Sequence, residues 1–420
     1  MLRVSFTLIT LILFAAAVSA AEFTPLFNGK DTTGWKSIGG KNKFYVEDGQ
    51  LILETGDESL QSYIVTEKTF ENFIVNVEFK FDAPFGSGLQ FRSVPHDGKD
   101  VAWGYQSEIS PEKYNGGFFD EGVKHNWLQD ITELEKKSGA AFKKNGWNTL
   151  EVKAVGPSLK ASLNGTLVAD VIDIQYSKGF IGFQIHESKT PGKLRIKSVT
   201  VKELPATPWI PLYADGKFGD IRPEVNWVQT EEPNKDYGSL VPKPVAKFQI
   251  QDDGSLRGTT APGEPRDGIL TSNDSYKDFA VKVSFKMEHG NSGLYFRAVE
   301  NTKPHWLSGF QCEIAEDASV NAALWEVDGR GWVQSTAANK AVSAKATKKS
   351  DWNDIATVAI GDHIVTFLNG QKVMDIIDPK PAHGFSGKVG LQLHGGGNQG
   401  CLWRDFYVMP LNEAAVNSIR

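Results

Sequence analysis

The chain has few of the residues and segments that mark several common classes of protein. It contains only two cysteines in 420 residues, and their spacing matches no zinc-binding signature. After the first twenty residues, no apolar run approaches the roughly 20 residues that a transmembrane helix needs. Neither a phosphate-binding glycine loop with its lysine nor a Gly-x-Ser-x-Gly motif occurs. The sequence therefore gives no support to a zinc module, a P-loop nucleotidase or an α/β-hydrolase.

Neither sign of charge is in large excess. The chain has 45 Lys and Arg against 51 Asp and Glu, which gives a net charge of -6. Mild acidity without a basic patch argues against binding to nucleic acid or to an anionic membrane surface. We therefore predict no nucleic-acid partner.

The first twenty residues resemble a secretory signal. Arg3 supplies the positive start, Leu8 to Val18 form the apolar centre, and small residues precede Ala21. An uncleaved anchor is the alternative, although the apolar run is short for a membrane span. We expect residues 1–20 to be a signal peptide and the mature chain to be exported, periplasmic or extracellular, with no membrane span.

The rest of the chain repeats itself at an offset of 205 residues. Gly88-Leu89-Gln90-Phe91-Arg92 recurs as Gly293-Leu294-Tyr295-Phe296-Arg297, and Gly104–Ile109 recurs as Gly309–Ile314. Because solenoid repeats are only 20–50 residues long, this period indicates two duplicated domains. A proline-rich connector near Leu204–Pro208 predicts a first domain over 22–204, a second over 205–410 and a tail over 411–420. The second copy also carries an insertion within Ile221–Lys247, with Trp227 and Tyr237, which is either a lid or a packing decoration.

Strand patterns dominate both copies. Phe73 to Phe81 alternates apolar and polar residues with the period of a half-buried antiparallel strand. Asn164-Gly165 predicts a tight hairpin, and Asp130 to Lys137 is the best short helix candidate. Many short strands separated by turn residues predict an all-β, two-sheet sandwich or jelly roll in each domain.

The same alternation places polar residues together on the face turned away from the core. In Phe310–Ile314 the apolar residues point inward, so Gln311 and Glu313 share the other face. The carboxylate or a histidine can move a proton, and arginine or amide donors can bind hydroxyls or an oxyanion. The alternative is an Arg–Glu ion pair on a solvated sheet. This face is predicted to hold Tyr295, Arg297, Gln311, Glu313, Gln392 and His394 in the second copy, and Gln90, Arg92, Gln106, Glu108, Gln184 and His186 in the first.

A loop after the Gln-x-Glu strand combines an acid, a cation and a tryptophan. In the second copy these are Glu326, Arg330 and Trp332, and in the first an acid is present at Asp120 or Glu121. An aromatic ring beside acidic side chains is a usual composition for sugar binding. An ordinary loop with a buried tryptophan is the alternative.

The order of these motifs resembles the 3-keto-disaccharide hydrolase family, formerly a domain of unknown function. The resemblance rests on Phe23–Lys30 with Gly34-Trp35, the Ser-Gly-Leu-x-Phe-Arg and Gly-aromatic-Gln-x-Glu-Ile strands, Trp-Asn, Leu-Asn-Gly and Gly-x-Gln-x-His. It covers both copies, Phe23 to Pro410. It implies two tandem concanavalin A-like jelly-roll domains.

The resemblance also implies a reaction. A ketone at C3 of a glucosyl unit acidifies the C2 hydrogen, so a base can form an enolate, the C1 substituent can leave, and water can add back. Glu313 or His394 is then the base, Arg297 and Gln311 are donors, and Glu326 with Arg330 contacts substrate or transfers protons. The candidate set for catalysis is Glu313, His394, Glu326, Glu108 and His186. The candidate set for substrate binding is Arg297, Gln311, Gln392, Arg330, Trp332, Tyr295, Arg92, Gln106, Gln184, Asp120 and Glu121.

Some alternatives stay open at this level. The second copy keeps Gly329-Arg330-Gly331-Trp332, whereas the first has Lys124 in this loop, and lysine cannot replace the planar fork of arginine. This favours the second domain as the more active copy. A non-catalytic carbohydrate-binding pair and an extracellular scaffold are the rival interpretations. No cofactor is indicated, although acidic loops can hold calcium without a sequence signature, and Cys312 and Cys401 either pair or stay free.

Overall fold

The computed structural model describes residues 22–56, 61–96, 101–188, 190–222, 246–260, 262–263, 267–300 and 307–419. The expected signal peptide lies outside the described residues, as does the interior of the expected insertion, with Trp227 and Tyr237. Within the described ranges, no helix is long and apolar enough to cross a membrane.

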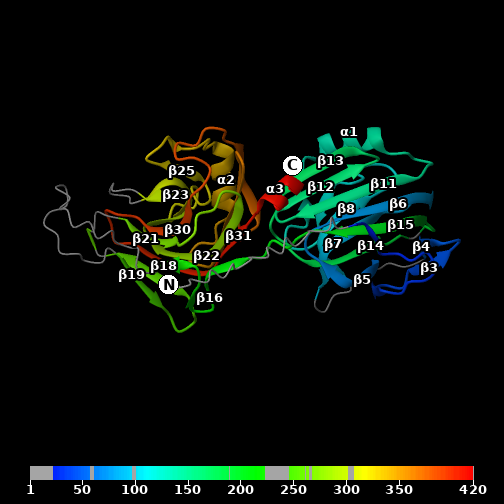
Figure 1. The fold of residues 1–420 in the computed structure, drawn as a ribbon, viewed down its shortest axis with the longest axis horizontal. Helices are drawn as coiled ribbons and strands as arrows, with labels where there is room; N and C mark the ends of the chain where they lie inside the picture. Colours follow the sequence, from blue (N-terminus) through cyan, green and yellow to red (C-terminus); the bar gives the residue numbers. More distant parts are fainter. Residues whose placement is uncertain are drawn as a thin grey trace, which may run out of the picture.

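The protein consists of two β-sandwich domains of the same design, as Figure 1 shows. Each domain has two antiparallel sheets that enclose an apolar core. This confirms the prediction of two tandem concanavalin A-like jelly rolls. Alternation produces the core directly, because Val75, Val77 and Phe79 of one strand are fully buried while the residues between them are half-buried.

The first domain contains strands β1 to β15. Its larger sheet has the order β13-β12-β11-β6-β15-β4-β3, with β1 beside β15. The strands of this sheet are β1 (Thr24–Pro25), β3 (Lys43–Glu47), β4 (Gln50–Glu54), β6 (Phe73–Ala83), β11 (Asn148–Val155), β12 (Ser158–Leu163), β13 (Thr166–Ile172) and β15 (Lys193–Glu203). The other sheet has the order β10-β9-β8-β7-β14-β5-β2. Its strands are β2 (Trp35–Gly39), β5 (Ser62–Phe70), β7 (Ser87–Pro95), β8 (Ala102–Ile109), β9 (Phe118–Asp120), β10 (Asn126–Trp127) and β14 (Gly179–Ile185).

The second domain repeats this plan with strands β16 to β31. Its larger sheet has the order β17-β16-β31-β22-β27-β28-β29. In addition, β20 pairs with β31, and β19 pairs with β20. These strands are β16 (Ile210–Ala214), β17 (Lys217–Phe218), β19 (Ala246–Ile250), β20 (Leu256–Thr260), β22 (Phe279–His289), β27 (Asn353–Ile360), β28 (His363–Leu368), β29 (Gln371–Ile377) and β31 (Gly400–Pro410). The other sheet, which carries the candidate site, has the order β18-β21-β30-β23-β24-β25-β26. Its strands are β18 (Ile221–Arg222), β21 (Gly268–Ser272), β23 (Asn291–Glu300), β24 (Leu307–Ala315), β25 (Leu324–Val327), β26 (Gly331–Trp332) and β30 (Lys388–Leu393).

Three helices accompany the strands among the described residues. Helix α1 (Ile131–Ala141) begins where the sequence predicts, because the Asp130 side chain accepts hydrogen bonds from two backbone amides of the first turn. Helix α2 (Ala337–Ala346) was not predicted; a capping box at Thr336 starts it. The hairpin at Asn164-Gly165 is confirmed, since Leu163 pairs with Thr166 across the turn.

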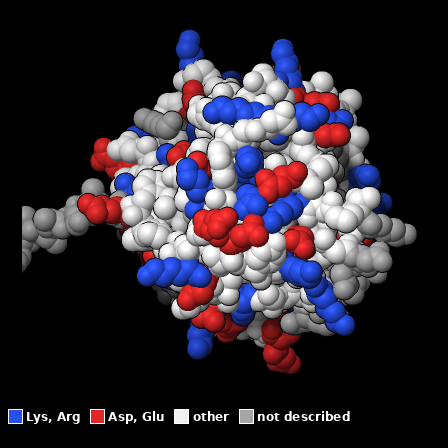
Figure 2. Space-filling model, turned by 90° about the vertical axis from the view of Figure 1, so that its right-hand side faces the viewer, with Lys and Arg blue, Asp and Glu red and all other residues white. Residues whose placement is uncertain are grey.

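The two cysteines are free and buried. Cys312 and Cys401 both belong to the core of the second domain, so the disulfide alternative is wrong for this structure. On the end of the first domain seen in Figure 2, positive and negative side chains are interspersed. That face therefore offers no single-sign field to a charged polymer.

A separate apolar cluster joins the domains. It combines Val155 of the first domain with Val365 and Phe367 of the second, and Ile172 and Ile174 pack against it. Residues 413–419 of the expected tail form helix α3 (Glu413–Ile419), which contacts β11 of the first domain (Figure 1). The last helix of the chain thus closes the junction between the two sandwiches.

Replacing Val416 with aspartate should weaken this junction. Val416 is 5% exposed within the joining cluster, and burying a charge there should cost about 2 kcal/mol or more. Thermal unfolding followed by circular dichroism should show a lower first transition for Val416→Asp.

The matched control is Asn417→Asp, which adds the same charge at an exposed position of the same helix. It should leave the transition within about 1 °C of wild type, since surface changes are usually within ±0.5 kcal/mol. Equal transitions for both variants would contradict the role given to α3.

Candidate functional site

The second domain has a pocket of about 360 Å³ on the open face of the sheet that carries β23, β24 and β30. Its volume lies at the lower end of the range for small-molecule sites. Polar side chains from these three strands form its floor, and the loop around β25 and β26 forms a wall. The lining includes Asn291, Tyr295, Gln311, Glu313, Trp325, Trp332, Gln392 and His394.

Glu313 is the acidic side chain of the floor. It is only 6% exposed, and its carboxylate accepts one hydrogen bond from the Asn291 amide and another, of 3.1 Å, from Gln311 Nε2. Burial raises the pKa of Glu313 to about 7, although these hydrogen bonds and the nearby His394 oppose the rise. A carboxyl group with this pKa can both accept and return a proton near neutral pH.

A glycine allows the glutamine to lie across the sheet. Gly293 is paired with Glu313 on the neighbouring strand, and a Cβ on Gly293 would lie only 2.5 Å from Gln311 Cγ. The first domain has the same arrangement at Gly88 and Gln106. The glycine of the Gly-Leu-x-Phe-Arg motif therefore makes room for the amide that holds the carboxylate.

Gln392 and His394 complete the floor from β30 and its end. Gln392 Nε2 donates to Asp267 Oδ2 at 2.8 Å and lies 3.4 Å from the Tyr295 hydroxyl. His394 is exposed at the pocket mouth, and its Nδ1 lies 2.5 Å from the Gly395 carbonyl oxygen. Since a carbonyl only accepts, Nδ1 carries a hydrogen, and proton exchange with a ligand falls to Nε2.

Two tryptophans form the wall. The rings of Trp325 and Trp332 lie 5.2 Å apart at 86°, and Trp332 is 45% exposed. An exposed indole beside buried polar groups combines an apolar ring face with hydrogen-bonding partners. This composition suits a sugar, which has both C–H faces and hydroxyl groups.

The first domain places the equivalent residues in a similar arrangement. Gln90 Nε2 donates to Gln106 Oε1 at 2.5 Å, and Gln106 Nε2 donates to Glu108 Oε2 at 3.0 Å. Burial raises the pKa of Glu108 to about 7, and the nearby Glu121 contributes to the rise. Burial also raises the pKa of Glu121, which interacts with His186 and Gln184. The first domain therefore brings two carboxyl groups together where the second, with Val327 at the position of Glu121, has one.

The prediction that Arg92 and Arg297 share this face is wrong. Both residues have positive φ values, 48° and 46°, and the strand register shifts beside each of them. This bulge turns the side chain away from the pocket. Arg297 donates to the Lys277 carbonyl oxygen at 2.9 Å and lies 5.4 Å from the Phe385 ring centroid.

Arg92 has an equivalent structural role. Its guanidinium donates to the carbonyl oxygens of Glu71 and Gly156 and to the Asn72 side chain. The Asn72 amide in turn bonds the Pro205 carbonyl oxygen and the Thr207 hydroxyl in the connector between the domains. Arg92 therefore anchors the connector and is not available to a ligand in the pocket.

Glu326, Arg330 and Asp120 are also corrected. Glu326 lines the pocket, but it pairs across the strands with Phe310, a core residue, and is only 1% exposed. Its carboxylate binds Arg330 Nε at 2.5 Å and the Ala382 amide at 2.7 Å. Burial alone would raise the pKa of Glu326, but these hydrogen bonds lower it. Arg330 also forms two hydrogen bonds, of 3.1 and 2.6 Å, with Asp378, so this cluster is a structural ion-pair network.

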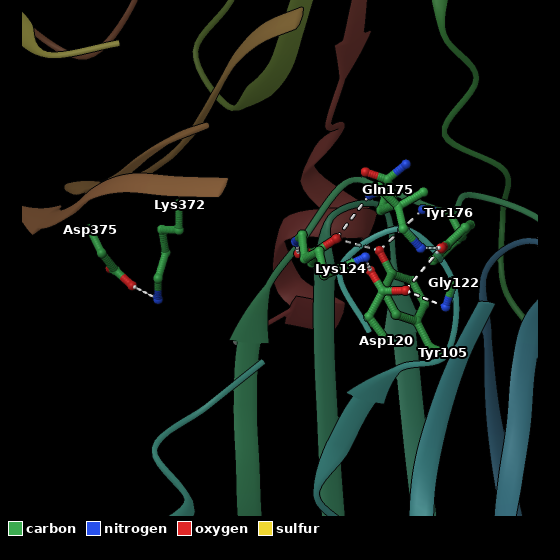
Figure 3. A network of polar contacts seen from close by, with 10 residues as sticks. Tyr105, Asp120, Gly122, Lys124, Gln175, Tyr176, Lys372 and Asp375 are labelled. Atoms are coloured by element: carbon green, nitrogen blue, oxygen red, sulfur yellow. Dashed lines mark hydrogen bonds and ion pairs between the residues drawn. The ribbon is translucent and has the colours of Figure 1, made fainter. Parts of the chain in front are cut away.

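The first domain builds the same network around Asp120 and Lys124. Figure 3 shows Asp120 bonded to the Gly122 amide and the Tyr176 hydroxyl. Lys124 forms an ion pair with Asp173, which also accepts from the Tyr105 hydroxyl at 2.6 Å. Tyr105 and Lys124 thus bind Asp173, whose counterpart in the second domain, Asp378, binds Arg330. The change from arginine to lysine alters this network and not the pocket, so it gives no reason to prefer the second domain.

Sequence reasoning missed several residues that shape the pockets. Asn291, which bonds Glu313, stands at the position of Gly86 in the first copy. Asp267 and its counterpart Gln61 both bond the glutamine of the last site strand. The 205-residue offset marks Asn291 as a difference between copies, but only the strand pairing brings Asp267 to the site. No group of three or more His, Cys, Asp or Glu among the described residues is arranged to hold a metal ion.

Replacing Arg297 with methionine should destabilise the second domain. The buried guanidinium holds the Lys277 carbonyl oxygen, so its loss leaves that acceptor unpaired at a cost of about 1–3 kcal/mol. Urea unfolding should show the loss. The control is Arg404→Met, an exposed arginine paired with Asp405, which should cost less than about 1 kcal/mol. An unchanged unfolding midpoint for Arg297→Met would contradict the structural role.

The chain is similar to several solved structures. A proposed glycosyl hydrolase from Parabacteroides distasonis is 25% identical and covers 44% of this chain and 94% of its own, with a TM-score of 0.33. The carbohydrate-binding module CBM66 from Bacillus subtilis is 18% identical and covers 41% and 96%, also with a TM-score of 0.33. No curated protein matches the chain.

The family comparison covers almost the whole described chain. The model of the 3-keto-alpha-glucoside-1,2-lyase-like domain matches twice, at residues 22–202 and 209–409. The two matches correspond to the two sandwiches, each with amide and carboxyl side chains together on one sheet face. The resemblance predicted from the sequence is thereby confirmed, and the chain belongs to the 3-keto-alpha-glucoside-1,2-lyase-like family.

Proposed function

We propose that the chain is an exported enzyme that cleaves 3-keto-glycosides, with the reaction taking place in the pocket of the second domain. The observation that carries the proposal is the state of Glu313, a buried carboxyl group with a pKa of about 7 at the floor of an open pocket. A general base works best when its pKa lies near the operating pH. The family membership supports the substrate class, and the signal-like first twenty residues support export.

In the first step Glu313 takes the proton from C2 of the 3-keto-glucosyl unit. The electron pair of the C2–H bond forms a C2=C3 double bond, and the ketone oxygen becomes an enolate oxygen. The Tyr295 hydroxyl, which accepts from Gln392 Nε2, is the donor we assign to this oxygen. Burial raises the pKa of Tyr295 well above its ordinary value, so the hydroxyl keeps its proton to donate.

In the second step the enolate expels the substituent at C1. The C3 ketone forms again, the electron pair moves to a C1=C2 double bond, and the leaving oxygen takes a proton. His394 is assigned as this proton donor, because its Nδ1 is held by a carbonyl and Nε2 exchanges the proton. Water then adds across C1=C2, with the hydroxyl on C1 and the hydrogen on C2, to give the free 3-keto-sugar.

The second candidate function is carbohydrate binding without turnover. The exposed Trp332 beside Trp325 favours it, because an aromatic platform binds a sugar whether or not a reaction follows. This sandwich architecture also supports many functions, so the fold does not decide between the two. An activity measurement decides between them.

The deciding test is turnover of 3-keto-trehalose by the mature protein. Wild type should release glucose and 3-keto-glucose, and Glu313→Gln should lower kcat/KM by roughly 10²–10⁴-fold, since it removes the general base while keeping the shape of the side chain. Liquid chromatography with mass detection of both products measures this.

The matched variant is Glu108→Gln, the same change in the first domain. It should leave most of the activity in place if the second pocket carries the reaction. Loss of product only in Glu108→Gln would move the reaction to the first domain. A folded wild type that binds the 3-keto-sugar without releasing product would refute the enzyme and favour the binding module.

The pH dependence provides an independent check of the base. Because the carboxyl of Glu313 must be ionised to accept the C2 proton, kcat/KM should rise with pH through about 7, and it should fall again at higher pH, where His394 no longer carries the proton that it donates. Initial rates between about pH 5 and pH 9 measure this, with circular dichroism to verify folding. A kcat/KM that does not rise between about pH 5 and pH 7 would exclude Glu313 as the base.

A further inference from the structure

A larger pocket lies at the junction of the two domains. Its volume is about 690 Å³, compared with about 360 Å³ for the second-domain pocket, and the two share no lining residue. The first domain contributes Lys124 and Gln175, the connector contributes Trp209, and the larger sheet of the second domain contributes Lys282 and Tyr407. Pockets at domain interfaces are common ligand sites, and this volume lies within their usual range.

The first domain lies close to a hairpin of the second domain at this pocket. A Cβ on Gly370 would lie 3.3 Å from Gln175 Oε1 and 3.7 Å from Lys124 Cε. Lys124 Nζ also lies 5.5 Å from the centre of the Phe367 ring. Figure 3 shows the first-domain network on one side, with Lys372 and Asp375 of β29 on the other. The lining is therefore set by how the two domains pack together.

The lining of this pocket has equal numbers of positive and negative side chains. Its lining has three lysines, Lys124, Lys282 and Lys348, and three aspartates, Asp173, Asp354 and Asp405. Some of these groups already have partners within the protein, because Lys124 pairs with Asp173 and the Ser284 hydroxyl donates to Asp354 at 2.6 Å. A balanced lining gives little attraction to a strongly charged ligand but offers donors and acceptors to a neutral one.

Lys282 is held between two aromatic rings. Its Nζ lies 4.6 Å from the centre of a Trp209 ring and 5.5 Å from that of Tyr407. It forms no hydrogen bond or ion pair with any residue in the part of the chain that the structure describes. Asp354 and Asp405 face it, and burial, outweighing their attraction, lowers the pKa of Lys282. The rings thus position the ammonium group while its N–H donors stay available to a ligand.

We propose that the junction pocket is a second binding site, which takes a neutral oligosaccharide. Trp209 and Tyr407 supply apolar surface for the C–H faces of sugar rings, and Lys282 with the carboxylates of Asp354 and Asp405 bonds hydroxyl groups. The site does not depend on the reaction proposed above, because it lies on the larger sheet of the second domain and not on the sheet that carries Glu313.

Protection of Lys282 from acetylation tests the proposal. The mature protein would be treated with a low concentration of acetic anhydride, with and without maltotetraose, cellotetraose or laminaritetraose, and digests would be analysed by mass spectrometry. At ligand concentrations about tenfold above Kd, labelling of Lys282 should fall roughly tenfold with at least one tetrasaccharide. Exposed Lys36 of the first domain is the internal control and should be labelled equally in all samples.

Two variants separate this site from the other pocket. Glu313→Gln should keep the protection of Lys282, and Lys282→Met should lose calorimetric binding of the protecting sugar while keeping the turnover of 3-keto-trehalose found for wild type. Absence of protection by all three tetrasaccharides would overturn the proposal. Loss of protection in Glu313→Gln, or protection only by an acidic oligosaccharide, would overturn it as well.

Discussion

The bulge at Arg92 and Arg297 is the feature on which the chemistry of Glu108 and Glu313 depends. It turns a guanidinium that alternation would place beside the glutamate toward backbone carbonyls on the other side of the sheet. An arginine next to Glu313 would stabilise the ionised carboxylate and lower its pKa. Without that cation, burial dominates, and the carboxyl group titrates near neutrality. Gly309 permits the bulge, since a Cβ there would lie 2.7 Å from Ala298 Cα.

Much of the fold was predictable from the sequence. The period of Phe73–Phe81, the Asn164-Gly165 turn and the duplicated motifs gave the strand content, a hairpin and the two domains. For the site, alternation placed Gln311, Glu313, Gln392 and His394 correctly on one face. It failed at Arg297 because a single extra residue in a strand reverses every later side chain. It missed the network that holds the Glu326 carboxylate, because Arg330 and Asp378 meet only through the fold, which is not a local property of the sequence.

The two copies keep the same framework but have changed their polar contacts in compensating ways. A tyrosine hydroxyl approaches the glutamine of the last site strand in both domains, but Tyr63 supplies it in the first and Tyr295 in the second. These residues lie on the two strands that flank the glutamine. Asn291 and Glu121 are the clearest differences, since one adds an amide and the other a carboxyl group. The framework therefore tolerates different substrates or different roles in its two domains.

The position of α3 at the end of the chain has a consequence for the order of assembly during translation. Domains fold largely as units, beginning with the one synthesised first. Val155 and Ile172 of the first domain, however, belong to a cluster that also needs Val416 and Ile419. The first domain therefore leaves the ribosome with an apolar edge that is not fully covered until the final helix emerges. A nascent chain has to keep that edge from other partners throughout the synthesis of the second domain.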